Sequence, residues 1–541
     1  MATHTVFNQP PPLEDLNLYT ADPVLAEFVE REGGSIHDQL LRGYGRNIGS
    51  SRAYKWGRDA NRYPPELHTH DRFGNRIDQV EFHPAWHALM ELSISHRVHS
   101  LPWVSAEGGF VARAAMMAMM AGVEAGHGCP ISMTASVVPA LRNAPELSKE
   151  WEPRLTSSVY DPRFVPAAEK DGALMGMGMT EKQGGSDVRA NTTRATPEVG
   201  DWYRITGHKW FTSAPMCDAF LILAQAPKGL TCFFLPRILD DGTVNSFMIQ
   251  RLKDKLGNHS NASSEVEFDG ALALLVGEEG RGVPTIIEMV NGTRLDCVSG
   301  STGLMRQAVM QAGHHVAHRS AFGSLLIDKP AMQMVLADLE VEVQAATVLM
   351  TRLAGAFDRA EGDVTEALVK RILTPVAKYW VTKRCTPVVR EAMECLGGAG
   401  YVEESIMPRI FRESPLNAIW EGSGNVVALD VVRVMAKEPK AIEALRQELE
   451  GSRGTDRRFD AYLDGTWQLV ERPENVEAQA RRIAERLAIA TQAALLMERA
   501  DGAVAEIFLA SRVAGDHGGM FGTQPVTSGT EEVARLTVPE P

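Results

Sequence analysis

The chain has 541 residues, and at roughly 150 residues per domain this length predicts three or four domains. The apolar fraction of 44%, the charged fraction of 23% and the mean hydropathy of -0.15 are those of a soluble globular protein and exclude a disordered or fibrous one. A net charge of -14 excludes a general attraction to nucleic acid, so such binding would need a local basic patch.

The sequence carries no sign of a targeting segment or a metal site. Its first residues, Met1 to Asn8, have no basic or apolar signal-peptide region, and no apolar run approaches the roughly 18 residues of a membrane helix. We therefore expect a cytoplasmic protein. The six cysteines form no CxxC pair, which favours reduced thiols. Two His pairs, His83/His87 and His314/His318, have i,i+4 spacing, but no further ligands complete them, so we expect no metal.

The chain divides into five expected segments. Residues 1–24, which include three consecutive prolines, are expected to form an extended N-terminal arm. Residues 25–173 are mostly helical in pattern, as in the Ala- and Met-rich run 111–125. Short apolar runs such as 202–206 and 219–224, punctuated by Gly and Pro, predict an antiparallel sheet or small barrel over 174–279.

Helical spacing returns in the second half of the sequence. The segment 280–438 contains long helical patterns at 304–319 and 329–356. The block 439–541, which begins at a Pro after Lys437-Glu438, is expected to be a further helical domain. The sequence therefore predicts a mainly α protein with an inserted antiparallel β domain and a C-terminal helical domain.

Glu421 is the candidate general base. It follows Ile419 and Trp420 and begins a Gly/Ser turn. A carboxylate that packs against apolar side chains with little water has its charged form disfavoured, which suits a group that accepts a proton. The alternative is a glutamate that only complements the dipole of the helix that follows.

Two glycine-containing segments could contact a cofactor. The loop 177–187, Met177-Gly178-Met179-Thr180-Glu181-Lys182-Gln183-Gly184-Gly185-Ser186-Asp187, offers backbone donors and hydroxyls to a planar ring and a phosphate, or forms an ordinary capped turn. The segment 397–401, Gly397-Gly398-Ala399-Gly400-Tyr401, is similar to a dinucleotide fingerprint but has no preceding strand, so we do not expect a Rossmann site.

In their order along 174–432, these motifs resemble those of the acyl-CoA dehydrogenase family of flavoproteins. The resemblance implies a helical domain, a β domain and a helical bundle, with FAD as cofactor. Phe211 stands where the family usually has Trp, and Glu394 stands where it usually has Gln. Arg319 begins a segment similar to the family's R-x-x-F-G, whose Arg reaches the FAD pyrophosphate of a neighbouring subunit.

The resemblance also implies the site residues. Glu421 is the implied base, since the position that serves one other branch is Thr293 here. The implied substrate contacts are Ser186 and Arg294. The implied FAD contacts are Met177, Met179, Thr180, Ser186, Phe211, Ser213, Arg319, Phe322, Gly397, Gly398, Trp420, Ser423 and Asn425.

Over nearly the whole chain the sequence is most similar to the alkylation-response, AidB-like branch. The similarity includes the arm from Thr3 to Pro10, the segment from Phe82 to His87 and the segment from Arg251 to Asn258. It implies a homotetramer that contains FAD, with weak acyl-CoA dehydrogenase activity, a link to alkylation damage and a C-terminal domain that binds double-stranded DNA. An electron-transfer flavoprotein or another acceptor would take the electrons.

Composition argues against avid DNA binding. Residues 440–541 contain 12 Lys+Arg and 17 Asp+Glu, a net charge of -5, whereas phosphate binding needs positive charge. Arginines nevertheless cluster locally, and the alternative to DNA contact is a solvated helix face. The candidate DNA contacts are Arg433, Arg481, Arg482, Arg486 and Arg512.

Two functions from different classes remain open at this point. One is FAD-dependent α,β-dehydrogenation of an acyl thioester, with Glu421 as base. The other is a DNA-associated protective protein in which the flavin fold is mainly a scaffold. A flavin oxidase of the same superfamily is a further alternative.

Overall fold

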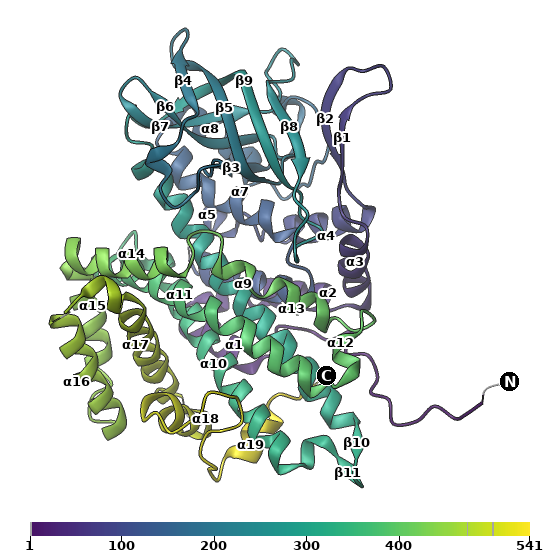
Figure 1. The fold of residues 1–541 in the computed structure, drawn as a ribbon, viewed down its shortest axis with the longest axis vertical. Helices are drawn as coiled ribbons and strands as arrows, with labels where there is room; N and C mark the ends of the chain where they lie inside the picture. The colour runs from purple at the N-terminus through teal and green to yellow at the C-terminus, as the bar shows by residue number, and fades with distance from the viewer. Residues whose placement is uncertain (1–2, 106, 473, 500–501, 541) are drawn as a thin grey trace. The chain divides into compact units, whose positions relative to one another are not determined.

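The computed structural model describes residues 3–105, 107–472, 474–499 and 502–540. The chain forms two compact units, shown in Figure 1. The first unit comprises Met1–Ser51, Glu107–Val123 and Cys297–Pro541, and the second comprises Arg52–Ala106 and Glu124–Asp296. Helix α9 (Gly282–His318) belongs in part to each unit.

The first unit is built around long helices. Helix α10 (Pro330–Arg359) begins with a proline at its first position, where the missing N–H costs nothing, and is buried on all sides from Leu336 to Phe357. It packs along α11 (Val364–Cys395). The other helices of this unit before residue 438 are α1 (Pro23–Arg31), α2 (Asp38–Ile48), α6 (Gly109–Val123), α12 (Gly398–Tyr401), α13 (Met407–Glu413) and α14 (Gly424–Lys437).

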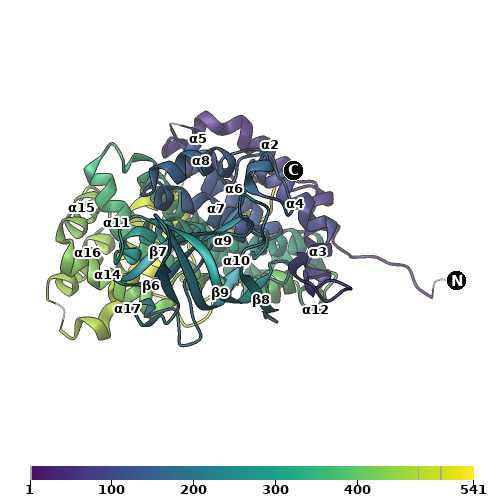
Figure 2. The same cartoon turned by 90° about the horizontal axis from the view of Figure 1, so that it is seen from above.

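The C-terminal segment packs within the first unit. Its helices are α15 (Pro439–Glu450), α16 (Arg457–Glu471), α17 (Val476–Met497), α18 (Gly502–Phe508) and α19 (Thr530–Arg535). Helix α17 packs against α10, α11 and α14, and α19 packs against α10. Figure 2 shows α15, α16 and α17 gathered beside α11 and α14.

The second unit begins with helices and a β-hairpin. Its helices are α3 (Ser51–Arg62), α4 (Pro84–Ser95), α5 (Leu101–Val104), α7 (Gly128–Leu141) and α8 (Pro145–Leu155). The hairpin of β1 (Glu66–His70) and β2 (Arg76–Glu81) lies where the sequence predicts mostly helix. Its strands are polar and half-exposed, so they lack the apolar alternation that marks a strand. Asp71 closes the turn by accepting the N–H groups of Phe73 and Asn75.

A seven-stranded sheet forms the rest of the second unit. Its strands are β3 (Met175–Gly178), β4 (Arg194–Pro197), β5 (Trp202–Ser213), β6 (Ala219–Ala226), β7 (Gly229–Pro236), β8 (Phe247–Leu252) and β9 (Ser263–Val276). The pairing runs β3-β6-β4-β5-β9-β7 and returns from β7 to β6, so that five strands close a ring, while β8 pairs with β9. The pairs β3–β6 and β4–β6 are parallel and the others antiparallel.

The predicted fold class, mainly α with an inserted β domain, is therefore confirmed, with two parallel pairings as the departure from an antiparallel sheet. A parallel pair needs a long crossover, and the segment from β3 to β6, which holds β4 and β5, supplies it. All six cysteines are free thiols. Across the described residues, no helix is long and apolar enough to cross a membrane.

Candidate functional site

In the second unit, a bulge at the end of β5 turns Phe211 outward. Lys209 is buried, and strict alternation would bury Phe211 as well. The register with β9 shifts between Lys209 and Thr212, so Thr212 takes the inward position instead. Phe211 is 51% exposed and is followed by the half-buried Ser213. An exposed ring beside a hydroxyl can contact a planar ligand on its face and its edge.

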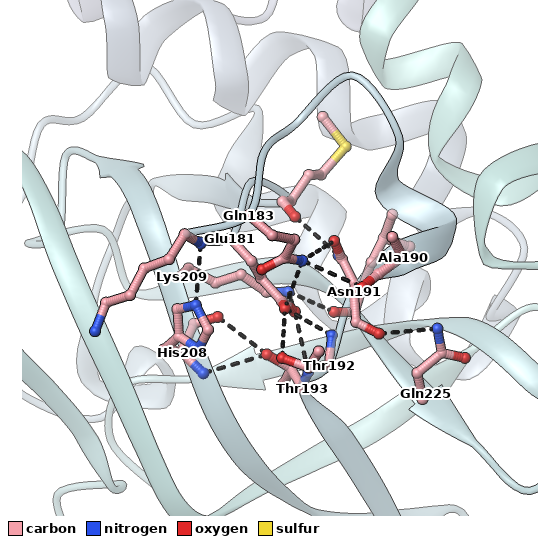
Figure 3. A network of polar contacts seen from close by, with 12 residues as sticks. Glu181, Gln183, Ala190, Asn191, Thr192, Thr193, His208, Lys209 and Gln225 are labelled. Carbon is pink, nitrogen blue, oxygen red and sulfur yellow. Dashed lines mark hydrogen bonds and ion pairs between the residues drawn. The ribbon is translucent and has the colours of Figure 1, made fainter.

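The loop before β4 is organised by a buried carboxylate, Glu181 (Figure 3). Its Oε2 accepts the backbone N–H (2.6 Å) and the hydroxyl (3.0 Å) of Thr192. Its Oε1 accepts the N–H of Thr193 (3.1 Å) and Lys209 Nζ (2.9 Å). Lys209 also donates to the carbonyl of Leu223 on β6 (2.7 Å). The carboxylate therefore ties the loop to two strands of the sheet.

Glu181 and Lys209 form a buried ion pair. Burial acts to raise the pKa of Glu181, but the Lys209 ammonium and the donors of Thr192 and Thr193 hold it well below its usual range. Burial lowers the pKa of Lys209 to about 8, against the opposing effect of Glu181. Both groups are therefore charged at pH 7.

The same network fixes the residues expected to meet FAD. Asn191 Nδ2 donates to the carbonyl of Met179 (2.9 Å), and the N–H of Trp210 donates to the carbonyl of Thr180 (2.8 Å). A β-carbon at Gly185 would lie 2.3 Å from the hydroxyl oxygen of Thr180, so only glycine allows this close approach. The loop is thus held with the side chains of Met179 and Thr180 half-buried.

The other candidates in this unit differ in exposure. Met177 on β3 is half-buried and Ser186 is exposed. Arg294 is buried on α9, at 6% exposure. Thr293, also buried, donates its hydroxyl to the carbonyl of Val290 within the same helix (3.1 Å). A threonine bonded in this way is not a base.

In the first unit, Glu421 lies in a strained turn between a 3₁₀ turn (Leu416–Ala418) and α14. Its φ is +56°, and that of Gly422 is +103°. A non-glycine residue in this region costs on the order of 1–3 kcal/mol and persists only where the surroundings enforce it. Glu421 is half-buried. Ile419 is 63% exposed, so it does not provide the apolar cover that the sequence suggested.

Side chains from two helices hold this turn. Lys378 on α11, at 1% exposure, donates from Nζ to the carbonyls of Trp420 (2.9 Å) and Gly422. The indole N–H of Trp420 donates to Asn417 Oδ1 (2.8 Å), and Asn417 Nδ2 donates to the hydroxyl of Ser301 on α9 (3.1 Å). The turn is therefore fixed from both sides.

Ser423 and Asn425 follow at the start of α14, and both are exposed. Asn425 Oδ1 accepts a hydrogen bond from Arg481 Nε (2.7 Å). Gly397 and Gly398 are also exposed, and a β-carbon added to either would meet no atom within 4 Å. Gly397 has a φ of +60°, which favours glycine.

Arg319 and Phe322 lie at a small hairpin of β10 (Ser320–Ala321) and β11 (Ser324–Leu325). Arg319 Nη1 donates to the carbonyl of Asn8 in the N-terminal arm (2.5 Å). Phe322, with a φ of +50°, is 98% exposed. The arm thus contacts the segment whose Arg was expected at a neighbour's cofactor.

Two of the candidate DNA contacts are engaged within the fold. Arg512 has a side chain only 7% exposed and pairs with Asp338 and with Glu342 (2.9 Å from Nε to Oε1). Arg486 donates to the carbonyl of Tyr462 (2.6 Å) and to the hydroxyl of Thr466 (3.0 Å). Both guanidinium groups are therefore bound within the fold and are not free to contact phosphates.

The remaining three arginines are accessible to different extents. Arg433 is 60% exposed, 3.5 Å from Asp430, and Arg482 is exposed. Arg481 is exposed but bonds to Asn425 next to the proposed catalytic turn. The five candidate arginines therefore do not form one free basic surface.

Each unit offers groups that fit part of FAD. In the second unit, the ring of Phe211 and the hydroxyls of Thr180 and Ser213 suit a planar ring with a polar edge. In the first unit, the open backbone at Gly397 and Gly398 leaves room for a cofactor to approach. Within the described residues, no three His, Cys, Asp or Glu side chains are grouped to hold a metal.

Three family models match the chain. The Adaptive response protein AidB N-terminal domain matches residues 8–162, the acyl-CoA dehydrogenase middle domain residues 176–271, and the acyl-CoA dehydrogenase C-terminal domain residues 280–436. The class defined by these matches and the fold is that of FAD-dependent oxidoreductases acting on CH–CH bonds.

Individual relatives agree with these models. AidB of Escherichia coli (strain K12) is 47% identical over 90% of each chain. Acyl-CoA dehydrogenase family member 11 of Caenorhabditis elegans is 30% identical over 84% of this chain and 76% of that protein. The chain belongs to the acyl-CoA dehydrogenase family and carries an AidB N-terminal domain.

Solved structures share the fold. The crystal structure of Caenorhabditis elegans ACDH-11 in complex with C11-CoA has a TM-score of 0.84 at 27% identity, covering 99% of this chain and 93% of that one. An acyl-CoA dehydrogenase from Bacillus anthracis complexed with FAD has a TM-score of 0.62 at 18% identity, covering 80% of this chain and 78% of that one.

Sequence reasoning missed three residues that shape these segments: Asn8, Lys209 and Lys378. The two lysines left a weak signal. Lys209 occupies an inward register of a strand, and Lys378 lies on the buried face of a helix. A lysine in such a position must satisfy its donors inside the protein. The partner of Asn8 is 312 residues away, which no local pattern indicates.

Proposed function

We propose that the protein dehydrogenates an acyl thioester between its α and β carbons, with Glu421 as the base that takes the α-proton. The observation that carries the proposal is the turn at Glu421. Glu421 is half-buried, and its backbone has a φ of +56°. A buried lysine, Lys378, holds the turn in this conformation through hydrogen bonds to the carbonyls of Trp420 and Gly422. Strain that the surroundings enforce is concentrated at active sites. Membership of the acyl-CoA dehydrogenase family supports the same function.

The residues divide the chemistry among them. Bound FAD supplies the acceptor for the β-hydrogen, which leaves as hydride. Glu421 removes the α-proton, and its backbone N–H stabilises the negative charge that develops on the thioester oxygen. Phe211 and Ser213 orient the flavin ring, while Ser186 and Arg294 contact the substrate.

The test is an anaerobic titration of the flavin-loaded protein with acyl-CoAs of graded chain length, including C11-CoA, with flavin bleaching as the signal. Glu421→Gln should retain FAD but slow bleaching by at least about 10² to 10⁴, the usual contribution of a general base. Glu404→Gln, at an exposed position of the same unit, is the control and should behave as wild type. Bleaching of Glu421→Gln at the wild-type rate would rule out this base.

We also propose that the protein binds one FAD per chain and assembles as a homotetramer in which a neighbour completes each cofactor site. Phe322 supports the assembly. Its side chain is 98% exposed, and its burial against a neighbouring subunit would stabilise the assembly by about 1.5–3 kcal/mol. Arg319, three residues before it, is held at the same hairpin. Light scattering of the purified protein tests the tetramer directly.

A second function proposed for the C-terminal segment is weak, sequence-independent binding of double-stranded DNA, linked to a response to alkylation damage. The name of the matching N-terminal family model, which refers to an adaptive response, is compatible with such a role. The exposure of Arg433 and Arg482 favours it, since exposed arginines can contact phosphates. If the protein retains no duplex at low salt, this second function fails and the dehydrogenase proposal is unaffected.

A further inference from the structure

A buried lysine lies beneath the proposed catalytic turn. Lys378 is 1% exposed on α11, and its neighbours on the same helix face, Thr374, Val381 and Thr382, are buried as well. Taking an ammonium out of water costs several kcal/mol unless the protein satisfies its donors. This position in a helix that packs in the core would ordinarily hold an apolar residue, so the lysine needs a reason.

The hydrogen bonds of Lys378 orient two peptide groups of the turn. Its Nζ bonds the carbonyl of Trp420 at 2.9 Å and also that of Gly422. Both peptide bonds are trans. In a trans peptide the C=O and the N–H point in opposite directions. The N–H groups of Glu421 and Ser423, which belong to these two peptides, are therefore directed away from the lysine.

The charge of the lysine also acts on these peptides. A hydrogen bond from a charged donor to a carbonyl is roughly twice as strong as a neutral one. Hydrogen bonds in a chain polarise one another, by about 10–30% for each bond. A carbonyl that accepts from an ammonium therefore makes the N–H of its own peptide a stronger donor. For the first of the two peptides, that N–H is the one on Glu421.

We propose that Lys378 is a positioning residue for the dehydrogenation: it fixes and polarises the Glu421 N–H that receives the developing charge of the thioester oxygen. The inference rests on the proposed function and deepens it. It attributes the strength of the Glu421 N–H as a hydrogen-bond donor to a side chain on α11. If Lys378 served folding alone, a neutral hydrogen-bond donor at this position would be enough. Polarisation of the Glu421 N–H requires the positive charge as well.

Two measurements on the flavin-loaded protein separate these roles. The first is hydrogen exchange over residues 416–428 without any acyl-CoA. The second is the infrared stretch of the thioester carbonyl of C11-CoA labelled with ¹³C at that carbon. Lys378→Met removes the charge and the donors, and Lys378→Gln keeps a neutral donor. Lys370→Met, two helical turns earlier on α11, is the matched control.

We expect Lys378→Met to exchange faster over 416–428, to shift the carbonyl stretch toward that of free C11-CoA and to lower kcat for flavin reduction by about 10², with KM changed less. Lys378→Gln should be intermediate, and Lys370→Met should match wild type. A carbonyl stretch in Lys378→Met equal to that of wild type would overturn the proposal, as would an effect of equal size in Lys370→Met.

The outcomes also distinguish this inference from the function on which it rests. If C11-CoA and the other acyl-CoAs fail to bleach the wild-type flavin, the proposed function fails, while the exchange data still decide whether Lys378 holds the turn. If Lys378→Met does not fold, Lys378→Gln is judged by the same two readings. Wild-type values for both readings in that variant would overturn the role of the charge.

Discussion

The side chain of Asn8 forms two hydrogen bonds with the backbone of Ser320, 312 residues further along the chain. Asn8 Nδ2 donates to the carbonyl at 2.8 Å, and the N–H of Ser320 donates to Asn8 Oδ1 at 2.7 Å. The backbone carbonyl of Asn8 accepts from Arg319. The N-terminal arm thus fixes the hairpin that is proposed to meet a neighbour's FAD.

Asn8→Gly should therefore weaken FAD binding and subunit assembly together. Glycine accepts the φ of +56° that Asn8 adopts, so this substitution removes the amide without straining the backbone. Two hydrogen bonds of about 0.5–1.5 kcal/mol each predict a rise in the dissociation constant of FAD by about tenfold. Fluorescence titration and light scattering measure both effects. Gln9→Ala is the control, and unchanged FAD affinity in Asn8→Gly would contradict the coupling.

The ion pair of Glu181 and Lys209 predicts a non-additive pair of substitutions. Glu181→Gln leaves the buried lysine unpaired and should destabilise the protein by about 3–5 kcal/mol, with loss of FAD. The double variant Glu181→Gln, Lys209→Met removes both charges and should recover part of that loss. Thermal unfolding with and without FAD measures the coupling. Additive losses would show that the pair does not act as a unit.

Acid should release the C-terminal segment from α10. Burial acts to raise the pKa of Glu342, but Arg384 and Arg512 lower it to about 2. Because the folded pKa lies below the ordinary value of about 4.3, this stabilisation is complete above that pH and is lost as pH falls toward 2. The loss is at most roughly 3 kcal/mol. The protection of residues 502–513 against hydrogen exchange, relative to the intrinsic exchange rate at each pH, should fall between pH 6 and pH 3.

Glu342→Gln is the check on this acid effect. It leaves Arg384 and Arg512 without their shared carboxylate, so it should loosen the same segment already at pH 7 and remove most of the further change at low pH. An acid response of wild-type size in Glu342→Gln would assign the effect to another group.

The proposed binding of duplex DNA should depend on Arg433 and Arg482, the exposed candidates outside the proposed catalytic turn. Arg433→Glu with Arg482→Glu should weaken binding to all duplexes alike and make the salt dependence shallower, by about 0.9 in the slope for each phosphate that is no longer neutralised. Arg535→Glu, an exposed arginine paired with Asp328 and Glu531, makes a charge change of the same kind and is the control. Equal weakening per substitution in the control would indicate a non-local charge effect.

The fold could be predicted to a large extent because its long helices and apolar strands carry strong periodic signals. The run 111–125 predicted the helix that forms at Gly109–Val123, and the patterns at 304–319 and 329–356 lie within or largely overlap α9 and α10. The β1–β2 hairpin was missed, since its stability comes from an Asp-capped turn rather than from apolar alternation. The parallel pairing of β3 with β6 depends on tertiary contacts.

The residues of the candidate site could be predicted where they belong to a short sequence motif. They could not be predicted where they are distant in sequence from the residues that they bind. Glu421 and the loop at 177–187 stand out in the sequence, but Lys378 bonds to residues 42 and 44 positions away. Arg512 illustrates the opposite error, because a charge that was expected to be exposed is paired inside the fold with Asp338 and Glu342. Charge patterns alone do not reveal such pairs.

The bulge at the end of β5 limits which sequence changes this segment can accept. Because the register shift between Lys209 and Thr212 decides which side chain leaves the core, the number of residues there matters more than their identity. Phe in place of Trp at position 211 preserves an outward aromatic ring. Deletion of one residue between 209 and 212 would instead remove the bulge and leave a single side chain between the two inward positions. Related chains should therefore vary in residue type at position 211 but keep the number of residues between Lys209 and Ser213 constant.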